Sequence, residues 1–117
     1  MDVERARALL AAERDEVQKL LAETEASGRE DRDSEDQTDA DISDPAQPLT
    51  QQGMDDAIAE SLRDRLAAVE RAELRLAAGT YGRSVQSGQP IPEERLEADP
   101  AAELTVEEAA AREAADQ

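Results

Sequence analysis

Two stripes of apolar residues, each repeating every three or four positions, place the strongest constraint on how this chain folds. The first stripe lies in residues 2–26 and contains Val3, Ala6, Leu9, Leu10, Val17, Leu20 and Leu21, interrupted once by Glu13. The second lies in residues 53–78 and contains Ile58, Leu62, Leu66, Val69, Ala72 and Leu76. Such spacing puts apolar side chains on one face of a helix. Two helices of similar length predict an antiparallel coiled-coil hairpin that buries both stripes together.

The remaining composition argues for an all-α fold without a thick core. The chain has 117 residues and a single aromatic residue, Tyr81. A chain of this length buries only a modest fraction of its surface. Between the two predicted helices, residues 27–52 are dominated by acids, Ser, Gly and Pro. Because such a composition cannot bury an apolar face, we expect an acidic loop at the tip of the hairpin.

The charge of the chain excludes several classes of partner. Thirteen basic residues stand against thirty acidic ones, which gives a net charge of -17. This charge repels both a phosphate backbone and an anionic membrane surface, so we expect no direct nucleic-acid binding and no membrane binding. No apolar run reaches the roughly 20 residues that a membrane span needs. The amino terminus lacks the basic-then-apolar layout of a signal peptide, so we expect a cytoplasmic protein.

The chain contains neither cysteine nor histidine. Disulfides, thiolate or imidazole metal sites, cysteine nucleophiles and Ser-His-Asp triads are therefore excluded. Asp31, Asp33 and Glu35 have the spacing of a calcium loop, but Asp36 and Ile42 replace its required glycine and glutamate. Paired carboxylates at the tip would lack the apolar walls that tune an acid for catalysis. We expect neither an enzyme nor a cofactor.

Residues 79–117 form a third region. Gly79 is placed to end the second helix, and a turn-rich stretch follows as far as Pro100. The alanine-rich tail then predicts a carboxy-terminal helix. Thr105 and Glu108 have the spacing of a capping box, in which each side chain bonds the backbone N–H of the other residue. The predicted domains are a hairpin over 1–78 and a small domain over 79–117.

The segment "AELRLAAGTYGRSVQSGQPIPEERLEADPAAELTVEEA" resembles the carboxy-terminal domain of the DksA/TraR family of bacterial transcription regulators. In that family a helix ends in Gly-Thr-Tyr-Gly, and a Cys-x-x-Cys pair, a Gly, Ile-Pro, Arg-Leu-x-Ala-x-Pro and a second Cys-x-x-Cys pair follow. This chain keeps the frame but has no thiol: Ser84 and Ser87 stand at the first pair, and Thr105 and Glu108 at the second. The residues that match are Gly79, Thr80, Tyr81, Gly82, Gly88, Ile91, Pro92, Arg95, Leu96, Ala98 and Pro100.

The resemblance implies a zinc knuckle that has lost its ligands. Four thiolates around zinc supply on the order of 10 kcal/mol to the folding of such small domains. Serine hydroxyls stay protonated near neutral pH and are poor zinc ligands, so we expect no structural zinc. The capping box and a small apolar cluster would hold the domain instead. The predicted members of this cluster are Tyr81, Val85, Ile91, Leu96, Leu104 and Val106.

The resemblance also implies a function. Members of this family reach into the secondary channel of bacterial RNA polymerase with their coiled coil, whose tip carries an Asp-x-x-Asp-x-Ala motif that acts near the active site. Asp41, Asp44 and Ala46 fit that motif. The chain would then be a transcription regulator that binds RNA polymerase without contacting DNA. The alternative is an acidic protein–protein interaction module that no longer acts in the channel, because an acidic stretch can also contain this pattern by chance.

The apolar stripes also bear on the oligomeric state. We expect a monomer, although an exposed apolar seam would also allow two chains to pair.

Overall fold

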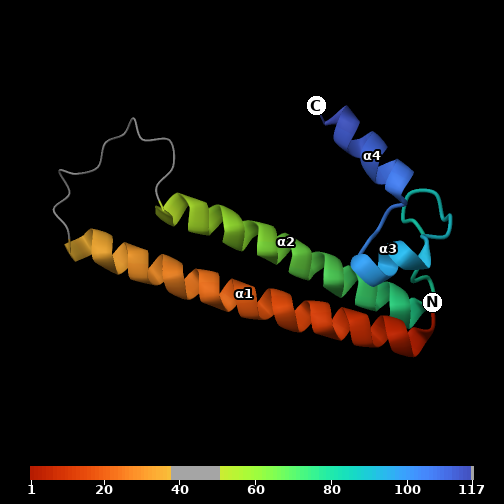
Figure 1. Ribbon diagram of the computed structural model, residues 1–117, viewed down its shortest axis with the longest axis horizontal. Coiled ribbons are helices and arrows are strands. Elements are labelled where there is room, and N and C mark those ends of the chain that lie inside the picture. The colour runs from red at the N-terminus through yellow and green to blue at the C-terminus, as the bar shows by residue number, and fades with distance from the viewer. Residues whose placement is uncertain (38–50, 117) are drawn as a thin grey trace. The chain divides into compact units, whose positions relative to one another are not determined.

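The computed structural model describes residues 1–37 and 51–116, with side chains described for residues 1–27 and 53–116. It contains four helices in these ranges, α1 (Val3–Gln37), α2 (Gln51–Ala78), α3 (Glu93–Ala98) and α4 (Val106–Ala115) (Figure 1). Apart from an isolated bridge between Arg83 and Pro90, the described residues contain no β structure. The predicted all-α class and the pairing of two long helices are confirmed.

The chain divides into two compact units. The first combines Met1–Asp15 with Ala67–Gln117, and the second is Glu16–Leu66. The first unit thus joins the start of α1 and the end of α2 to the carboxy-terminal segment. The predicted domains divide the sequence at residue 78, whereas these units are defined by contacts in space. The two helix ends belong to the first unit because they share apolar contacts with residues 79–117.

The core of the first unit forms where the beginning of α1 runs antiparallel to the end of α2 (Figure 1). Leu10 and Val69 are fully buried there, and Ala72 and Ala101 complete the cluster. The burial of Val69 and Ala72 follows from the sequence, because these residues and Leu76 recur on one face of α2. Ala68, Leu76 and Tyr81 pack against the same cluster.

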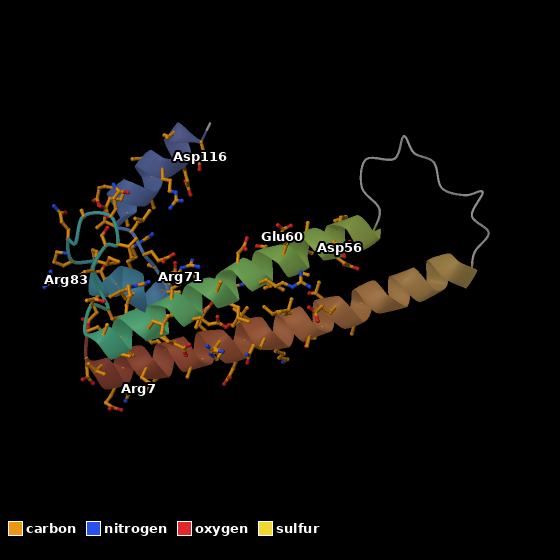
Figure 2. All side chains as sticks on the ribbon, turned by 180° about the vertical axis from the view of Figure 1, so that it is seen from behind. Arg7, Asp56, Glu60, Arg71, Arg83 and Asp116 are labelled. Carbon is orange, nitrogen blue, oxygen red and sulfur yellow. The ribbon has the colours of Figure 1, made fainter. Side chains whose placement is uncertain are left out.

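The second unit has a thinner core. Val17, Ala59 and Leu62 are buried, and Arg63 pairs with Glu25 at 3.0 Å. Ile58, which the apolar stripe placed in the seam, is 47% exposed, and its neighbour Ala59 is buried instead. The stripe prediction was wrong at this position because adjacent residues on a helix face directions about 100° apart. Figure 2 shows charged side chains along this stretch of α2, where Asp56 and Glu60 are labelled.

α1 is longer than the sequence predicted. It continues to Gln37, whereas the sequence predicts its end near Ala26 and a loop over 27–52. Gly28 is a weak helix breaker, costing about 1 kcal/mol relative to alanine, and no proline occurs before Pro45. Glu and Arg in this stretch also favour helix. Composition alone therefore overstated the length of the acidic loop.

α2 ends as predicted at Gly79. This residue has a φ of 80°, in the left-handed region that glycine adopts without steric cost. The Gly79 N–H donates to the carbonyl of Leu76 at 3.2 Å, and the Thr80 N–H donates to that of Arg75 at 2.9 Å. These bonds satisfy carbonyls at the end of the helix. Within the described ranges, none of the helices is long and apolar enough to cross a membrane.

We expect Leu10→Ala to destabilise the protein by about 2–5 kcal/mol, because the truncation leaves a cavity in a fully buried site. Denaturant unfolding followed by circular dichroism measures this loss. The matched control is Leu74→Ala, since Leu74 is 71% exposed and its truncation should change stability by no more than about 0.5 kcal/mol. Equal losses for the two variants would contradict the packing described here.

Tyr81 provides a pH-dependent test of the same packing. Burial raises the pKa of its phenol above the ordinary value of about 10. A raised pKa in the folded state means that the neutral phenol contributes to the free energy of unfolding. This contribution is fully present below pH about 10 and is lost as the pH rises through the pKa of the folded state. Ultraviolet titration reads this directly, since Tyr81 is the only aromatic residue. The midpoint in the native chain should exceed that of the chain unfolded in denaturant, and coincident midpoints would show that the ring is not buried.

Candidate functional site

Two groups of residues are candidates for function, and the structure describes one of them. Asp41, Asp44 and Ala46, the predicted tip motif, lie outside the described residues. Their role stays a prediction. The four positions that match the family's zinc ligands, Ser84, Ser87, Thr105 and Glu108, are described and lie in the first unit.

The first ligand pair lies in a tight turn. The Ser84 N–H donates to the carbonyl of Gln89 at 2.8 Å, and the Gly88 N–H donates to that of Ser84 at 2.9 Å. The Ile91 N–H closes the base of the turn on the Gly82 carbonyl at 2.8 Å. Gly82 has a φ of 88°, in the left-handed region that glycine adopts without steric cost. The turn therefore keeps a knuckle-like shape in a chain without cysteine.

The hydroxyl of Ser84 organises this turn from within. Its Oγ accepts hydrogen bonds from the N–H groups of Gln86 at 3.1 Å and Ser87 at 3.2 Å. Serine commonly closes turns in this way because its side chain can replace a backbone acceptor. Ser84 is buried, so these bonds give its hydroxyl oxygen partners within the protein.

The second ligand pair begins α4. The Glu108 N–H donates to the hydroxyl oxygen of Thr105 at 3.2 Å, and the Thr105 N–H donates to Oε1 of Glu108 at 2.9 Å. The predicted capping box is confirmed. Each residue thereby satisfies a backbone donor that the first turn of a helix leaves without a partner.

The hydroxyls of Ser84 and Ser87 also affect Glu108. Together with the Thr105 N–H, which lies 2.9 Å from Oε1 of Glu108, they favour the ionised carboxylate and lower the pKa of Glu108 to about 2, with Ser84 contributing most. Donors that stabilise the charged form keep a carboxyl ionised. The sequence predicted the capping box but not the effect of the two serines on the pKa of Glu108, because the two pairs are separated along the chain.

The donor set at these four positions does not fit zinc. Glu108 supplies the one anionic group, and Ser84, Ser87 and Thr105 offer only hydroxyl oxygens. Zinc in structural sites prefers thiolates and imidazoles in a complete tetrahedral set. In the part of the chain that the structure describes, no group of three or more His, Cys, Asp or Glu side chains could hold a metal ion.

A second apolar cluster lies beside this site. Ile91, Leu96 and Ala102 are buried, and Tyr81 packs against them while its hydroxyl donates to the carbonyl of Pro100 at 2.8 Å. The prediction that Val85 and Val106 belong to this cluster was wrong, since both are more than half exposed. The Val85 N–H bonds the carbonyl of Glu103 at 2.9 Å, so this residue contributes through its backbone.

Arginine–carboxylate pairs add polar ties within the first unit. Arg71 forms two hydrogen bonds of 3.0 Å with Glu103, and Arg75 adds a third at 3.3 Å. These partners, Arg71 first, lower the pKa of Glu103. Arg95 has a different kind of partner, since its Nε donates to the carbonyl of Leu104 at 2.9 Å. Charge composition cannot identify such partners because they are distant in sequence.

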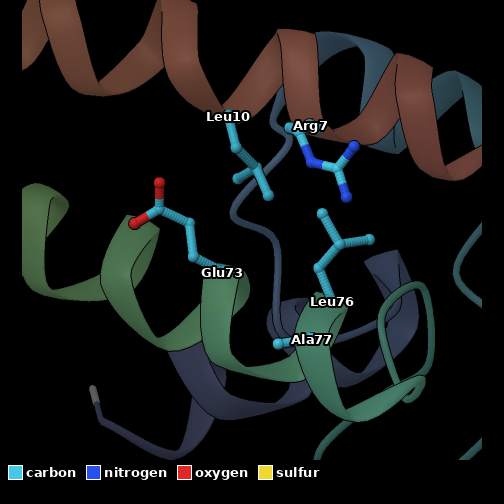
Figure 3. A pocket seen from close by; sticks show the side chains of 5 residues that line it. All are labelled: Arg7, Leu10, Glu73, Leu76 and Ala77. Atoms are coloured by element: carbon cyan, nitrogen blue, oxygen red, sulfur yellow. The ribbon is translucent and has the colours of Figure 1, made fainter.

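A pocket of about 320 Å³ lies in the first unit between α1 and α2. Arg7, Leu10, Glu73, Leu76 and Ala77 line it (Figure 3). Its charged groups already have partners, because Arg7 pairs with Glu4 at 3.0 Å and Glu73 pairs with Arg14. Leu10 and Leu76 belong to the core of the unit. We assign no ligand to this pocket.

Comparison with known proteins gives close relatives, although no protein-family model matches the chain. "General stress protein 16O" of Bacillus subtilis is 38% identical over 85 residues, and the match covers 73% of this chain but only 52%, about half, of that protein. "RNA polymerase-binding transcription factor DksA" of Caulobacter vibrioides is 33% identical over 96 residues, covering 77% of this chain and 68% of the relative.

A solved structure agrees with these matches. The structure of transcription factor DksA2 from Pseudomonas aeruginosa superposes with a TM-score of 0.72 and 26% identity, covering 97% of this chain and 84% of that one. The helical hairpin and the knuckle without cysteines occur together in one chain, and the Caulobacter relative matches over more than two thirds of its length. The chain is therefore a member of the DksA/TraR family that lacks all four ligand cysteines.

Proposed function

We propose that this chain is a transcription regulator that binds bacterial RNA polymerase. The observation that carries the proposal is the match to the Caulobacter protein, whose name describes an RNA polymerase-binding transcription factor. The structural likeness to DksA2, also named a transcription factor, supports the same role. A family of transcription factors agrees with the expectation that the chain is not an enzyme.

We further propose that the hairpin enters the secondary channel of the polymerase. Asp41, Asp44 and Ala46 fall in sequence between Gln37, where α1 ends, and Gln51, where α2 begins. Residues that connect two antiparallel helices come at the end of the hairpin. In the proposed mechanism the two aspartates act near the polymerase active site, as the family resemblance implies. Such a position would change initiation without any contact between the regulator and promoter DNA.

The net charge of -17 supports regulation without DNA contact. Proteins that bind nucleic acid directly gain affinity by neutralising phosphates with Lys and Arg. This chain has more than twice as many acidic as basic residues, thirty against thirteen, so its field opposes such binding. The protein would therefore reach a promoter through the polymerase.

The alternative is an acidic interaction module that recognises another protein. The density of acids around Asp41 and Asp44 favours it, because a motif of two aspartates carries little information in such a stretch. Pro45 within the motif also restricts the backbone of its neighbours. A pull-down of purified bacterial RNA polymerase, with competition from a known secondary-channel factor, separates the two functions. Binding that the competitor displaces supports the channel role, and absence of binding supports the alternative.

We expect Asp41→Asn/Asp44→Asn to abolish the effect on transcription in vitro while polymerase binding changes by no more than about fivefold. Exposed charge interactions contribute up to about 1 kcal/mol, so the rest of the hairpin should retain the complex. The matched control is Asp31→Asn/Asp33→Asn, which removes the same charge from the same acidic stretch. The control should keep its transcriptional effect. Equal loss in both double variants would show that total charge, and not the motif, carries the activity.

A further inference from the structure

We propose that the carboxylate of Glu103, paired with Arg71 and Arg75, is a latch that holds the carboxy-terminal region, residues 79–117, to the end of α2. Opening this latch releases the turn of residues 82–92 as one local unit, while the paired helices stay folded. Glu103 and both arginines lie in the first unit. The inference rests on hydrogen bonds within the chain and does not depend on polymerase binding.

The first step of the argument is that one carboxylate pairs with two arginines of α2. Nε and Nη2 of Arg71 donate to Glu103 at 3.0 Å each, one to each carboxylate oxygen. Nη1 of Arg75 donates to Oε2 of Glu103 at 3.3 Å. The two arginines are four positions apart, so they are neighbours on one face of the helix. Because two parallel bonds from a guanidinium fix the direction of a carboxylate as well as its distance, Glu103 is tied to one place on α2.

The second step is that the backbone at Glu103 binds other parts of the carboxy-terminal region. The carbonyl of Glu103 accepts a hydrogen bond at 2.9 Å from the N–H of Val85, which belongs to the turn. The next carbonyl, that of Leu104, accepts one at 2.9 Å from Nε of Arg95 in α3. Glu103 therefore bonds α2 through its side chain and the turn through its backbone.

The third step concerns the charge of Arg75. Its side chain is only 15% exposed, and that of Glu103 is 28% exposed. Nε of Arg75 is buried and has no hydrogen-bond partner within the part of the chain that the structure describes. Removing the partner of a mostly buried charge costs more than breaking an exposed pair. Loss of the Glu103 charge therefore favours a conformation in which the segment that carries it moves off α2 and water reaches Arg75.

The fourth step is that this segment has few apolar contacts of its own. Ala101 contributes to the cluster built on Leu10, and Ala102 to the cluster built on Ile91. An alanine brings one methyl group to a core, and the free energy gained on burial scales with the apolar area. These contacts alone hold the segment weakly, so the pairing of Glu103 decides whether it stays in place.

Amide hydrogen exchange of the full chain, read by NMR, gives the first test. The reporters are the amides of Ser84, Val85 and Ile91, which are hydrogen-bonded within the carboxy-terminal region, and the reference is the amide of Val69 in α2. Glu103→Gln should lower the protection of the reporters at least about tenfold more than that of the reference, because a local unit opens independently of the helices. Equal losses, or no loss, would overturn the inference.

Two further variants control this test. Glu107→Gln removes the same charge from an exposed position in the first turn of α4. It should leave the protection of the reporters within about twofold of the native value. Glu103→Asp keeps the charge but withdraws it by one methylene group, so its loss should lie between those of the native chain and Glu103→Gln. A loss from Glu107→Gln as large as that from Glu103→Gln, or a larger one from Glu103→Asp, would contradict the latch.

A double variant tests the part played by Arg75. Arg75→Met keeps an unbranched side chain but removes the cation, so no buried charge is left without a partner when Glu103 is neutralised. Arg75→Met/Glu103→Gln should therefore recover part of the protection that Glu103→Gln alone loses. Losses that add would overturn the proposal, because the two side chains would then act independently.

Discussion

The packing of one aromatic ring joins the parts of the first unit. Tyr81 contacts both apolar clusters, the one built on Leu10 and Val69 and the one built on Ile91 and Leu96. Its hydroxyl reaches the Pro100 carbonyl, so the ring is held at both ends. An aromatic side chain buries a large area and loses few degrees of freedom on doing so, which explains how a chain with one such residue can still build a core. The helix ends and the carboxy-terminal turn depend on this shared contact.

Pairs of charged side chains link segments of the first unit that its apolar core does not hold together alone. The chain has a single aromatic side chain, and within its first unit several arginines bridge segments through carboxylates, as Arg71 and Arg75 do at Glu103. Exposed pairs such as Arg5 with Glu97 contribute little individually, whereas partly buried ones such as Arg75 with Glu103 constrain the geometry more. With so few basic residues in an acidic chain, much of the basic charge is used internally. The surface that a partner meets is correspondingly negative.

The features that sequence reasoning predicted are those set by local spacing. The helical stripes, the glycine at the end of α2 and the capping box of α4 all depend on residues within a few positions of each other, and all are present. The errors have several causes. α1 continues to Gln37 because its acidic stretch favours helix more than composition suggested, Ala59 is buried in place of Ile58, and Val85 and Val106 are more than half exposed. The pairing of Arg71 with Glu103 could not be predicted, because nothing in a single sequence marks partners that are distant along the chain.

The loss of every thiol changes which chemical conditions the knuckle responds to. Cysteine thiolates are oxidised by peroxide and exchange with disulfides, and a zinc site made of them releases its metal when this happens. Hydroxyls and carboxylates undergo neither reaction. The sulfur atoms that remain belong to Met1 and Met54, which lie outside residues 79–117. The fold of this region consequently does not depend on the redox state of its surroundings. This property follows from having oxygen atoms at the four positions where sulfur would stand.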